Sequence, residues 1–331
     1  MIKDSRLNLL IQWLSQFDYL TDITPIPLDN DASFRRYFRI IAKKKYIVMD
    51  APPEFEDCKS FVQISRYLSS MGLNCPRVIE ADFEQGFLLL TDLGSVDYLS
   101  EIKAYPQRSE SLYKSAIECL LIIQEIGVDT QSDLPLYDSN MLQEELNLFR
   151  DWLCKRHLNI VFTSQDDYEW NLFCNDLIEN IIEQPRVFVH RDYHSRNLMV
   201  LESNNIGILD FQDAVEGPYT YDLVSLLKDC YIKFPDKVIK ERAKYFFIQK
   251  NKFGINEKKF FRDFDLMGVQ RHMKAAGIFA RLYHRDGKER YLADIPRTLE
   301  YIVDLLNKYE VLDYIQKLIS YDVIPRINRR T

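Results

Sequence analysis

The spacing of hydrophobic residues over the first 94 positions predicts a small sheet accompanied by helices. Apolar residues recur at three- and four-residue intervals between residues 5 and 20, which predicts an amphipathic helix there. A second helical pattern begins at residue 58 and ends at Gly72. Strand-like runs, separated by turn-prone or polar residues, lie at 23–28, 33–40, 45–52, 77–82 and 86–94. The first three of these runs follow one another directly, as expected of an antiparallel meander.

Beyond Gly94 the hydrophobic pattern becomes mainly helical. Helical periodicity dominates residues 106–185 and again residues 219–318. Three short strand-like runs between these regions, at 186–189, 197–201 and 206–211, predict a small strand cluster. We therefore expect an α+β chain with a boundary near residues 91–95. The predicted parts are an N-terminal lobe of sheet and helices, residues 1–93, and a mainly helical C-terminal lobe, residues 94–331.

Composition and charge narrow the class of protein. The 331 residues are 47% hydrophobic and 28% charged, which is typical of a globular chain. A formal net charge of -7 argues against a general nucleic-acid binder, although a local basic cleft would be compatible with it. Six cysteines without a C-x-x-C pair predict reduced thiols in a cytoplasmic protein. We expect neither a secretion signal nor a membrane span.

The stretch VFVHRDYHSRNLMV, residues 187–200, places many polar side chains after an apolar run. His190, Asp192 and His194 alternate, so on an extended strand they would share one face. This alternation alone would fit a metal-dependent hydrolase. No further His or Cys lies close by, however, and the nearest acid at the end of a strand pattern is Asp210. A different chemistry therefore explains the pattern better.

Phosphoryl transfer needs this set of polar groups. One carboxylate must orient an attacking hydroxyl and accept its proton, and oxygen ligands must hold Mg²⁺ against the phosphates of ATP. Asp192 suits the first role, and Asn197 and Asp210 suit the second. Each residue alone would more often be structural, because isolated His and Asp residues commonly pack or cap. The ordered set at the ends of strand patterns favours a catalytic site.

The segments HRDYHSRN and ILDFQ resemble the H-x-D-x-x-x-x-N and D-F-G elements of protein kinases. They are more similar to the aminoglycoside phosphotransferase and choline kinase relatives, which carry a histidine at the position of His194. This resemblance implies a two-lobed, protein-kinase-like fold that binds ATP and Mg²⁺ between the lobes. It also implies that His190, His194 and Asp222 support the catalytic loop structurally.

Further blocks resemble the anomeric kinases of cell-wall sugar recycling within that family. The similar blocks are DNDASFRRYFRI, IVMDAPPE, GFLLLTDLG, HRDYHSRN, LDFQDAVEGPYTYDLVSLLKDCY and IFARLYHRDGK. The resemblance implies ATP-dependent phosphorylation of N-acetylmuramate or N-acetylglucosamine at the C1 hydroxyl. It implies a small-molecule acceptor, with no nucleic acid or membrane as partner. The fold alone does not determine which acceptor a protein binds. An aminoglycoside, choline or another small alcohol therefore remains an alternative acceptor.

One departure from the kinase pattern concerns the phosphate anchor. A kinase third strand carries a lysine that pairs with ATP phosphates, but here Met49 or Asp50 stands roughly in its place. Positive charge is available on the preceding strand at Arg35, Arg36 and Arg39, and we expect Arg35 or Arg36 to take over the anchor. The alternative is a solvated face of the strand. Because the lysine is missing, the chain could also be a pseudokinase that binds nucleotide without catalysis. The presence of Asp192, Asn197 and Asp210 argues against that alternative.

Two other segments are expected to contact the nucleotide. The first hairpin lacks a glycine-rich loop, so Ser33 and its neighbours would meet the phosphates through hydroxyl and backbone N–H groups. The segment LLLTDLG resembles the hinge between kinase lobes, where the backbone near Asp92 and Leu93 would meet adenine. The alternative for the second segment is an ordinary turn in which Asp92 and Gly94 serve the turn geometry.

A set of basic residues in the C-terminal half is a candidate for substrate binding. Arg271, Lys274, Arg281 and Arg285 fall within about 80° of one another on a helix wound at 100° per residue. Such a stripe is commonly solvated. Because the resemblance implies an acidic sugar as substrate, we expect at least one of the three arginines to face it.

Overall fold

The computed structural model describes residues 4–20, 23–28, 34–126, 133–202, 205–250 and 254–329. The chain folds into two compact units. Unit 1 comprises Met1–Val96 and Met199–Asp213, and unit 2 comprises Asp97–Leu198 and Ala214–Thr331. The change of hydrophobic spacing near residues 91–95 gave no sign that Met199–Asp213 belongs to unit 1. The division into lobes of residues 1–93 and 94–331 stays a prediction.

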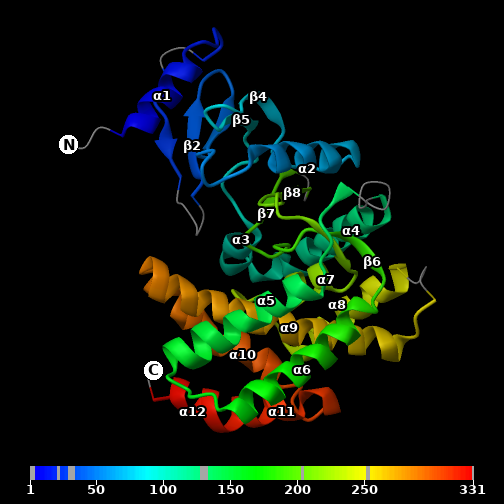
Figure 1. The fold of residues 1–331 in the computed structure, drawn as a ribbon. Coiled ribbons are helices and arrows are strands. Elements are labelled where there is room, and N and C mark those ends of the chain that lie inside the picture. The colour runs from blue at the N-terminus through cyan, green and yellow to red at the C-terminus, as the bar shows by residue number, and fades with distance from the viewer. Residues whose placement is uncertain are drawn as a thin grey trace. The chain divides into compact units, whose positions relative to one another are not determined.

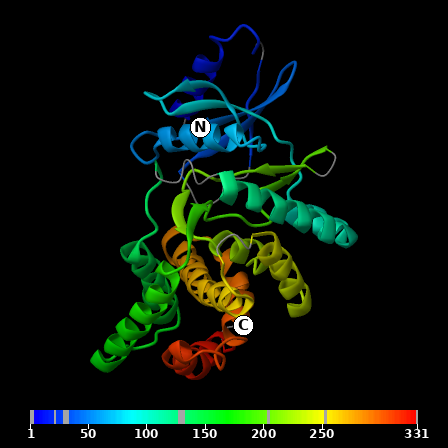
Figure 2. The same ribbon diagram turned by 90° about the vertical axis from the view of Figure 1, so that its right-hand side faces the viewer.

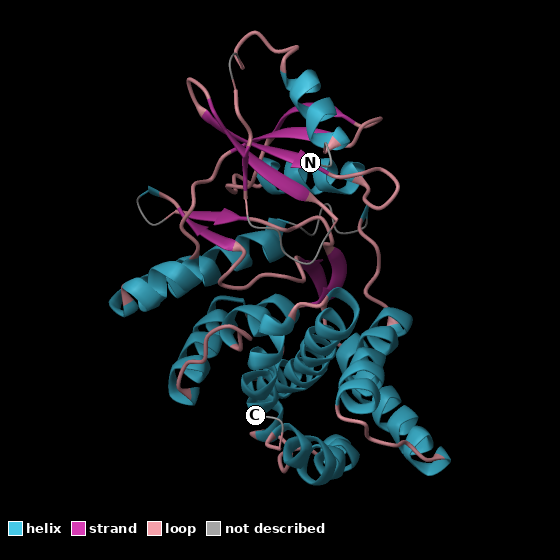
Figure 3. Cartoon of the chain, turned by 90° about the vertical axis from the view of Figure 1, so that its left-hand side faces the viewer, coloured by secondary structure: helices cyan, strands magenta, loops and turns pink. Residues whose placement is uncertain are grey.

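Unit 1 contains a five-stranded antiparallel sheet (Figure 3). Its strands are β1 (Ile26–Pro27), β2 (Arg36–Ile41), β3 (Lys45–Asp50), β4 (Val78–Asp82) and β5 (Phe87–Thr91). The spatial order is β1-β2-β3-β5-β4, so the expected meander is present in the first three strands. Strand β5 lies in the interior of the sheet because four of its five residues are buried and apolar. Strand β4 alternates between half-buried and exposed residues, as expected at an edge.

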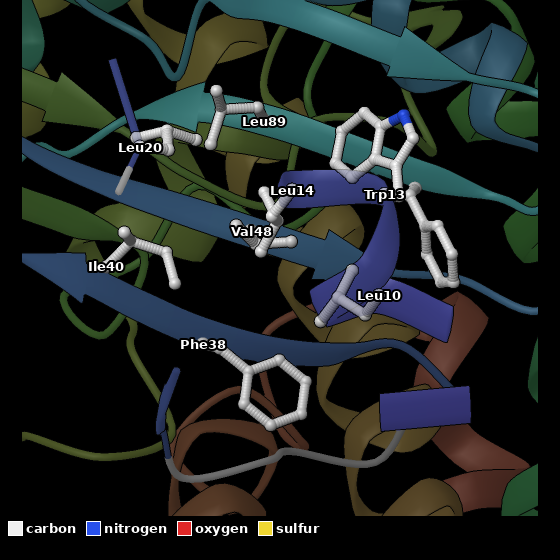
Figure 4. Packing of buried hydrophobic residues seen from close by; sticks show 9 residues of the cluster. Leu10, Trp13, Leu14, Leu20, Phe38, Ile40, Val48 and Leu89 are labelled. Atoms are coloured by element: carbon white, nitrogen blue, oxygen red, sulfur yellow. The ribbon is translucent and has the colours of Figure 1, made fainter. Parts of the chain in front are cut away.

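Helix α1 (Ser5–Leu14) covers this sheet and is shorter than the pattern over residues 5–20 predicts. Its N-cap is Asp4, whose carboxylate accepts a hydrogen bond from the backbone N–H of Leu7. After Leu14 the backbone turns, and Leu20 packs onto the same core without continuing the helix. Figure 4 shows Trp13, Leu20 and residues of β2, β3 and β5 around this core. The apolar spacing thus marked the buried face correctly, although not the end of the helix.

Helix α2 (Cys58–Ser70) is the other helix of unit 1 and begins at the N-cap Asp57. The expected end is confirmed, since Gly72 has a left-handed φ of 77° just beyond the helix. Strands β7 (Leu198–Val200) and β8 (Ile206–Ile208) form a separate two-stranded sheet. Two backbone hydrogen bonds join this pair to the N-terminal segment, from Val200 to Val96 and from Ile208 to Asn74.

Unit 2 is mainly helical (Figure 1). Its helices are α3 (Tyr98–Ala104), α4 (Ser109–Ile126), α5 (Ser139–Leu148), α6 (Ser164–Ile182), α7 (Tyr221–Leu227), α8 (Asp236–Lys250), α9 (Glu257–Asp286), α10 (Ile295–Val303), α11 (Asp313–Lys317) and α12 (Ile324–Ile327). Shorter 3₁₀ and π-helical segments are η1 (Pro106–Arg108), η4 (Phe149–His157), η7 (Glu289–Asp294), η8 (Glu310–Leu312) and η9 (Leu318–Val323). Within the described ranges, no helix has the length and apolar character needed to cross a bilayer.

Strand β6 (Arg186–Val189) pairs with β9 (Val215–Pro218), not with the two runs that follow it in sequence. The single strand cluster expected from residues 186–211 is therefore wrong, because these runs belong to two separate sheets. The sequence VEGP of β9 contains Gly and Pro and predicts a turn more readily than a strand. Its pairing with β6 fixes the strand that leads directly into the polar segment.

Helix α9 is the central helix of unit 2, with 30 residues (Figure 2). It begins at the N-cap Asn256 and ends at Gly287, which has a φ of 66°. Its neighbours include α5, α7 and α10. At Gly277 the crossing with the junction of α5 and η4 is tight, since an added Cβ would lie 2.5 Å from the backbone N of Phe149. All six cysteines of the chain are buried and free of disulfides.

Candidate active site

The polar segment after β6 is a loop, so the expectation that His190, Asp192 and His194 share one strand face is wrong. The strand ends at Val189, and Arg191 has a φ of 74°. A non-glycine residue in this region costs on the order of 1–3 kcal/mol and persists only where its surroundings fix it. The carboxylate of Asp222, on α7, supplies such a constraint by accepting the N–H groups of His190 at 2.7 Å and Arg191 at 3.0 Å.

Asp222 is fully buried beneath this loop. Burial raises the pKa of its carboxyl to about 7, although the two backbone N–H donors act in the opposite direction. Its hydrogen bonds go to backbone groups of the loop, so it acts on the shape of the loop. A second acid, Asp229, holds the middle of the loop by accepting the N–H of Ser195 at 3.0 Å and its hydroxyl at 2.5 Å.

Asp192 presents a half-buried carboxylate. Among the described residues no group donates a hydrogen bond to that carboxylate or lies within ion-pair distance of it. Burial alone would raise its pKa, but the positive charges led by Lys274 outweigh burial and lower the pKa. The carboxylate is therefore ionised near neutral pH and able to accept a hydrogen bond from a bound hydroxyl.

Asn197 and His194 complete the loop. The side-chain NH₂ of Asn197 donates to the backbone carbonyl of Asp192 at 3.0 Å, and its backbone N–H donates to His194 at 2.9 Å. The amide oxygen of Asn197 is the atom of this side chain that is of a type that binds Mg²⁺. Burial lowers the pKa of His194, whose ring packs edge-on against Tyr231. His194 is thus a neutral packing residue of the loop.

Asp210 belongs to unit 1 and has a φ of 59°. Its side chain is about half exposed, and Oδ1 accepts a hydrogen bond from the Gln212 amide at 3.1 Å. The following residue, Phe211, is fully buried against Phe61 of α2, with ring centroids 4.8 Å apart. The hydroxyl of Ser60 also donates to the Gln212 carbonyl at 2.6 Å. Helix α2 therefore fixes the segment that presents Asp210.

Arg35 lies close to Asp210 within unit 1. Its guanidinium forms an ion pair with Glu56 at 2.7 Å, and its Nη1 lies 4.0 Å from Asp210 Oδ1. The side chain is only 10% exposed, so the pair is largely desolvated. Burial acts to lower the pKa of Arg35, but neighbouring acidic groups raise it overall. Glu56 thus holds a permanent positive charge beside a candidate metal ligand.

Arg36 has a different environment. It pairs with the carboxylates of Asp4 and Asp50, the latter at 2.5 Å. Asp50 is fully buried on β3, roughly where a kinase carries its lysine, and also binds Arg6 at 2.5 Å. Two arginines therefore neutralise one buried carboxylate at this place in the sheet. The contacts of Arg36 tie β2 and β3 to the start of α1.

The hinge-like segment and the first hairpin complete the expected nucleotide contacts. The Asp92 carboxylate accepts Arg39 Nε at 2.7 Å and the backbone N–H of Gly94 at 2.8 Å, so its side chain shapes the turn. Leu93 is half-buried beside Gly207. Ser33 lies outside the described residues. The backbone role expected for Asp92 and Leu93 stays a prediction.

The basic residues of α9 do not form one solvated stripe. Arg271 is 6% exposed, and its Nη1 donates to the sulfur of Cys230 at 3.7 Å. Among the described residues its buried Nε has no hydrogen-bond partner. Arg281 is half-buried, whereas Arg285 is exposed and pairs with Asp286 at 2.7 Å. Arg271 is thus the arginine of this set that lies in the same charged environment as Asp192.

Sequence reasoning did not identify Glu145 and Asp229, two buried acids that contact the loop. Glu145 lies 46 residues before its partner Arg191, and no motif relates the two. Asp229 falls in the block LDFQDAVEGPYTYDLVSLLKDCY, but an acid within an apolar run is a weak signal by itself. The available signal was a charged residue in a helical pattern that otherwise predicts burial.

The fold and the loop define a phosphotransferase of the kinase-like class. The model of the phosphotransferase enzyme family, abbreviated APH, matches residues 24–256 of the chain. The chain therefore belongs to the phosphotransferase enzyme family, which confirms the resemblance seen in HRDYHSRN and ILDFQ.

Two curated relatives have the same name, N-acetylmuramate/N-acetylglucosamine kinase. The relative from Pseudomonas aeruginosa is 45% identical over 282 residues, covering 84% of this chain and 82% of the relative. The relative from Neisseria meningitidis is 35% identical over 295 residues, covering 85% of each chain.

Solved structures confirm the α+β, two-lobed fold class. An ethanolamine kinase from Plasmodium vivax has a TM-score of 0.64 at 12% identity, covering 89% of this chain and 86% of its own. An ADP-bound aminoglycoside phosphotransferase has a TM-score of 0.61 at 14% identity, covering 91% and 98%. A choline kinase from Cryptosporidium parvum has a TM-score of 0.62 at 13% identity, covering 91% and 97%.

Proposed function

We propose that this protein is an ATP-dependent sugar kinase that phosphorylates the C1 hydroxyl of N-acetylmuramate, N-acetylglucosamine or both. Family membership and the name shared by relatives that are 45% and 35% identical support this acceptor class. The observation that carries the proposal is the Asp192 carboxylate, which is ionised and unengaged by described residues in the loop that matches the family motif. A small molecule is the expected partner, and the cytoplasm, where ATP is available, is the expected location.

In this proposal Asp192 accepts the proton of the attacking hydroxyl. A new bond forms between the C1 oxygen and the γ-phosphorus, while the bond from that phosphorus to the β-γ bridging oxygen of ATP breaks and ADP leaves. Asn197 and Asp210 carry the oxygen ligands that Mg²⁺ prefers, and the ion would neutralise charge on the phosphates. His190, His194 and Asp222 hold the loop, and Asp92 and Leu93 meet the adenine through their backbone.

The product formed from Mg-ATP tests this proposal. Each sugar is incubated with protein and Mg-ATP, and the product is followed by ³¹P and ¹H NMR. The expected product is an acid-labile glycosyl phosphate that has lost the reducing-end signals of the free sugar. Choline and an aminoglycoside serve as alternative acceptors in parallel samples. Phosphorylation of either alternative, with none at C1 of the sugars, would assign a different substrate class. ATP binding without transfer to any acceptor would favour the pseudokinase.

The nucleotide anchor is predicted to be Arg35, with Arg36 as the matched comparison. Arg35→Ala should raise the KM for ATP and lower kcat, because it removes a fixed positive charge beside Asp210. Arg36→Ala removes an ion pair with the buried Asp50, so we expect it chiefly to lower the free energy of unfolding. Steady-state kinetics and thermal unfolding of both variants check this assignment. If both variants had native kinetics, neither arginine would be the phosphate anchor, and both would have only a structural role.

Arg271 is predicted to bind the lactyl carboxylate of N-acetylmuramate. The candidates from sequence were Arg271, Arg281 and Arg285. Arg271 and Arg281 each have a buried Nε without a partner among the described residues, but Arg271 is the more buried and adds positive charge near Asp192. A charged hydrogen bond is worth about 1.5–3 kcal/mol, so Arg271→Ala should lower kcat/KM for N-acetylmuramate about ten- to a hundredfold. The value for N-acetylglucosamine should change much less. Arg285→Ala, at the exposed end of α9, is the control; equal losses for both sugars would contradict the assignment.

A further inference from the structure

Glu145, on α5, is a buried acid that receives four hydrogen-bond donors. It is 6% exposed. Its Oε1 is 2.5 Å from Arg191 Nη2 and 2.7 Å from Lys274 Nζ. Its Oε2 accepts the Gln270 amide at 2.9 Å and the hydroxyl of Tyr137. One oxygen thus binds two cations while the other binds two neutral donors, which satisfies the carboxylate fully.

The contacts of Glu145 join separate parts of unit 2. Gln270 and Lys274 lie on α9, which packs beside α5 (Figure 1), and Arg191 lies in the loop that carries Asp192. Lys274 also donates to the hydroxyl of Tyr221 at 3.0 Å, the residue next to Asp222. The network therefore reaches the loop through the guanidinium of Arg191 and reaches the start of α7 through Lys274.

The charges in this network depend on Glu145. Burial acts to raise the pKa of Glu145, but Lys274 and Arg191 lower it overall, so the carboxylate is ionised. Lys274, and to a smaller degree Arg191, also contribute positive charge near Asp192. If Glu145 lost its charge, two buried cations would lose the acid that balances them, and the side chains would rearrange toward solvent or toward Asp192.

We propose that Glu145 is a positioning residue for phosphoryl transfer, holding Asp192 in place through Arg191 and Lys274. Arg191 has a left-handed backbone that needs external support. Asp222 binds its backbone N–H, and Glu145 binds its guanidinium, so both ends of the residue are fixed. The role in transfer rests on the proposed function of Asp192 as base, whereas the contact with the loop does not depend on the acceptor.

The test is the near-isosteric change Glu145→Gln, measured in the full-length protein. We expect kcat to fall about ten- to a hundredfold, since a displacement of about 1 Å at a reacting group can cost that much. The KM for ATP should stay close to native, because Glu145 contacts the loop of Asp192 and no residue proposed to hold the nucleotide. Amide hydrogen exchange in a peptide covering residues 186–197 should become faster.

Asp265→Asn is the matched control. Asp265 is also 6% exposed, and it binds Lys228 at 3.0 Å, Lys308 at 2.5 Å and the hydroxyl of Tyr309 at 2.9 Å. Like Glu145, it is a buried acid with two cationic partners, but it has no contact with Arg191. We expect this variant to lower the melting temperature while kcat and exchange in residues 186–197 stay native.

The outcomes separate this inference from the proposed function. If the unmutated protein phosphorylated neither sugar, the proposed function would be wrong. Hydrogen exchange in Glu145→Gln would still show whether Glu145 holds the loop. Native exchange and native kcat in Glu145→Gln would overturn the inference while leaving the sugar kinase intact. Equal loss of kcat in Glu145→Gln and Asp265→Asn would also overturn it, since general destabilisation would then explain both.

Discussion

Replacing Asp192 with Asn is expected to lower kcat about 10²- to 10⁴-fold while the affinity for ATP changes little. The amide has nearly the shape of the carboxylate but cannot accept the proton of a hydroxyl. The native carboxylate has a lowered pKa and is unengaged by described residues, so the native loop contacts should survive the change. Single-turnover transfer and equilibrium binding of ATP measure the two quantities separately.

The control for this variant is Asp304→Asn, which changes an exposed acid in the same unit. It should leave both quantities native. If Asp192→Asn kept native turnover, Asp192 would not be the base. If it lost ATP binding to the same degree as turnover, the residue would act on the nucleotide and not on the acceptor hydroxyl.

Replacing Asp210 with Ala is expected to abolish the magnesium-dependent part of nucleotide binding. A carboxylate oxygen is the ligand that Mg²⁺ would lose. Because Asp210 has a φ of 59°, alanine would also strain the backbone, whereas asparagine tolerates this region. Asp210→Ala should therefore lose the magnesium dependence and some stability, whereas Asp210→Asn, which keeps an amide oxygen but no charge, should weaken the magnesium dependence at native stability.

Calorimetric titration with ADP, in the presence and absence of Mg²⁺, measures this effect. Asp213→Asn is the neighbouring control: Asp213 is exposed and also contacts the Gln212 amide, at 3.0 Å. It should retain the native response to Mg²⁺. A native response in Asp210→Ala would remove Asp210 from the metal site.

Local patterns predicted the elements and the family motif because both depend on residues close in sequence. The strands of unit 1 and the end of α2 at Gly72 follow from alternation and from a glycine with positive φ. The loop conformation could not be obtained in this way. Arg191 leaves the strand because Asp222, 31 residues later, binds its N–H, and spacing within the motif carries no sign of that contact.

Charged residues were the least predictable part of the site. Arg35, Arg36 and Arg39 are close in sequence, yet each pairs with a different acid: Glu56, Asp50 and Asp92 respectively. The arginines of α9 likewise range from buried to exposed. Partner choice is set by which strands and helices pack together, so a single sequence shows the charges and not their pairing.

The tight crossing at Gly277 limits which substitutions the middle of α9 could accept. Gly277 lies one helical turn after Lys274, and the residues that it meets, Leu148 and Phe149, lie one turn after Glu145. Any side chain at 277 would push the two helices apart at the point that sets the distance between Lys274 and Glu145. A mutant library directed at the residues around Arg271 and Lys274 should therefore keep glycine at 277.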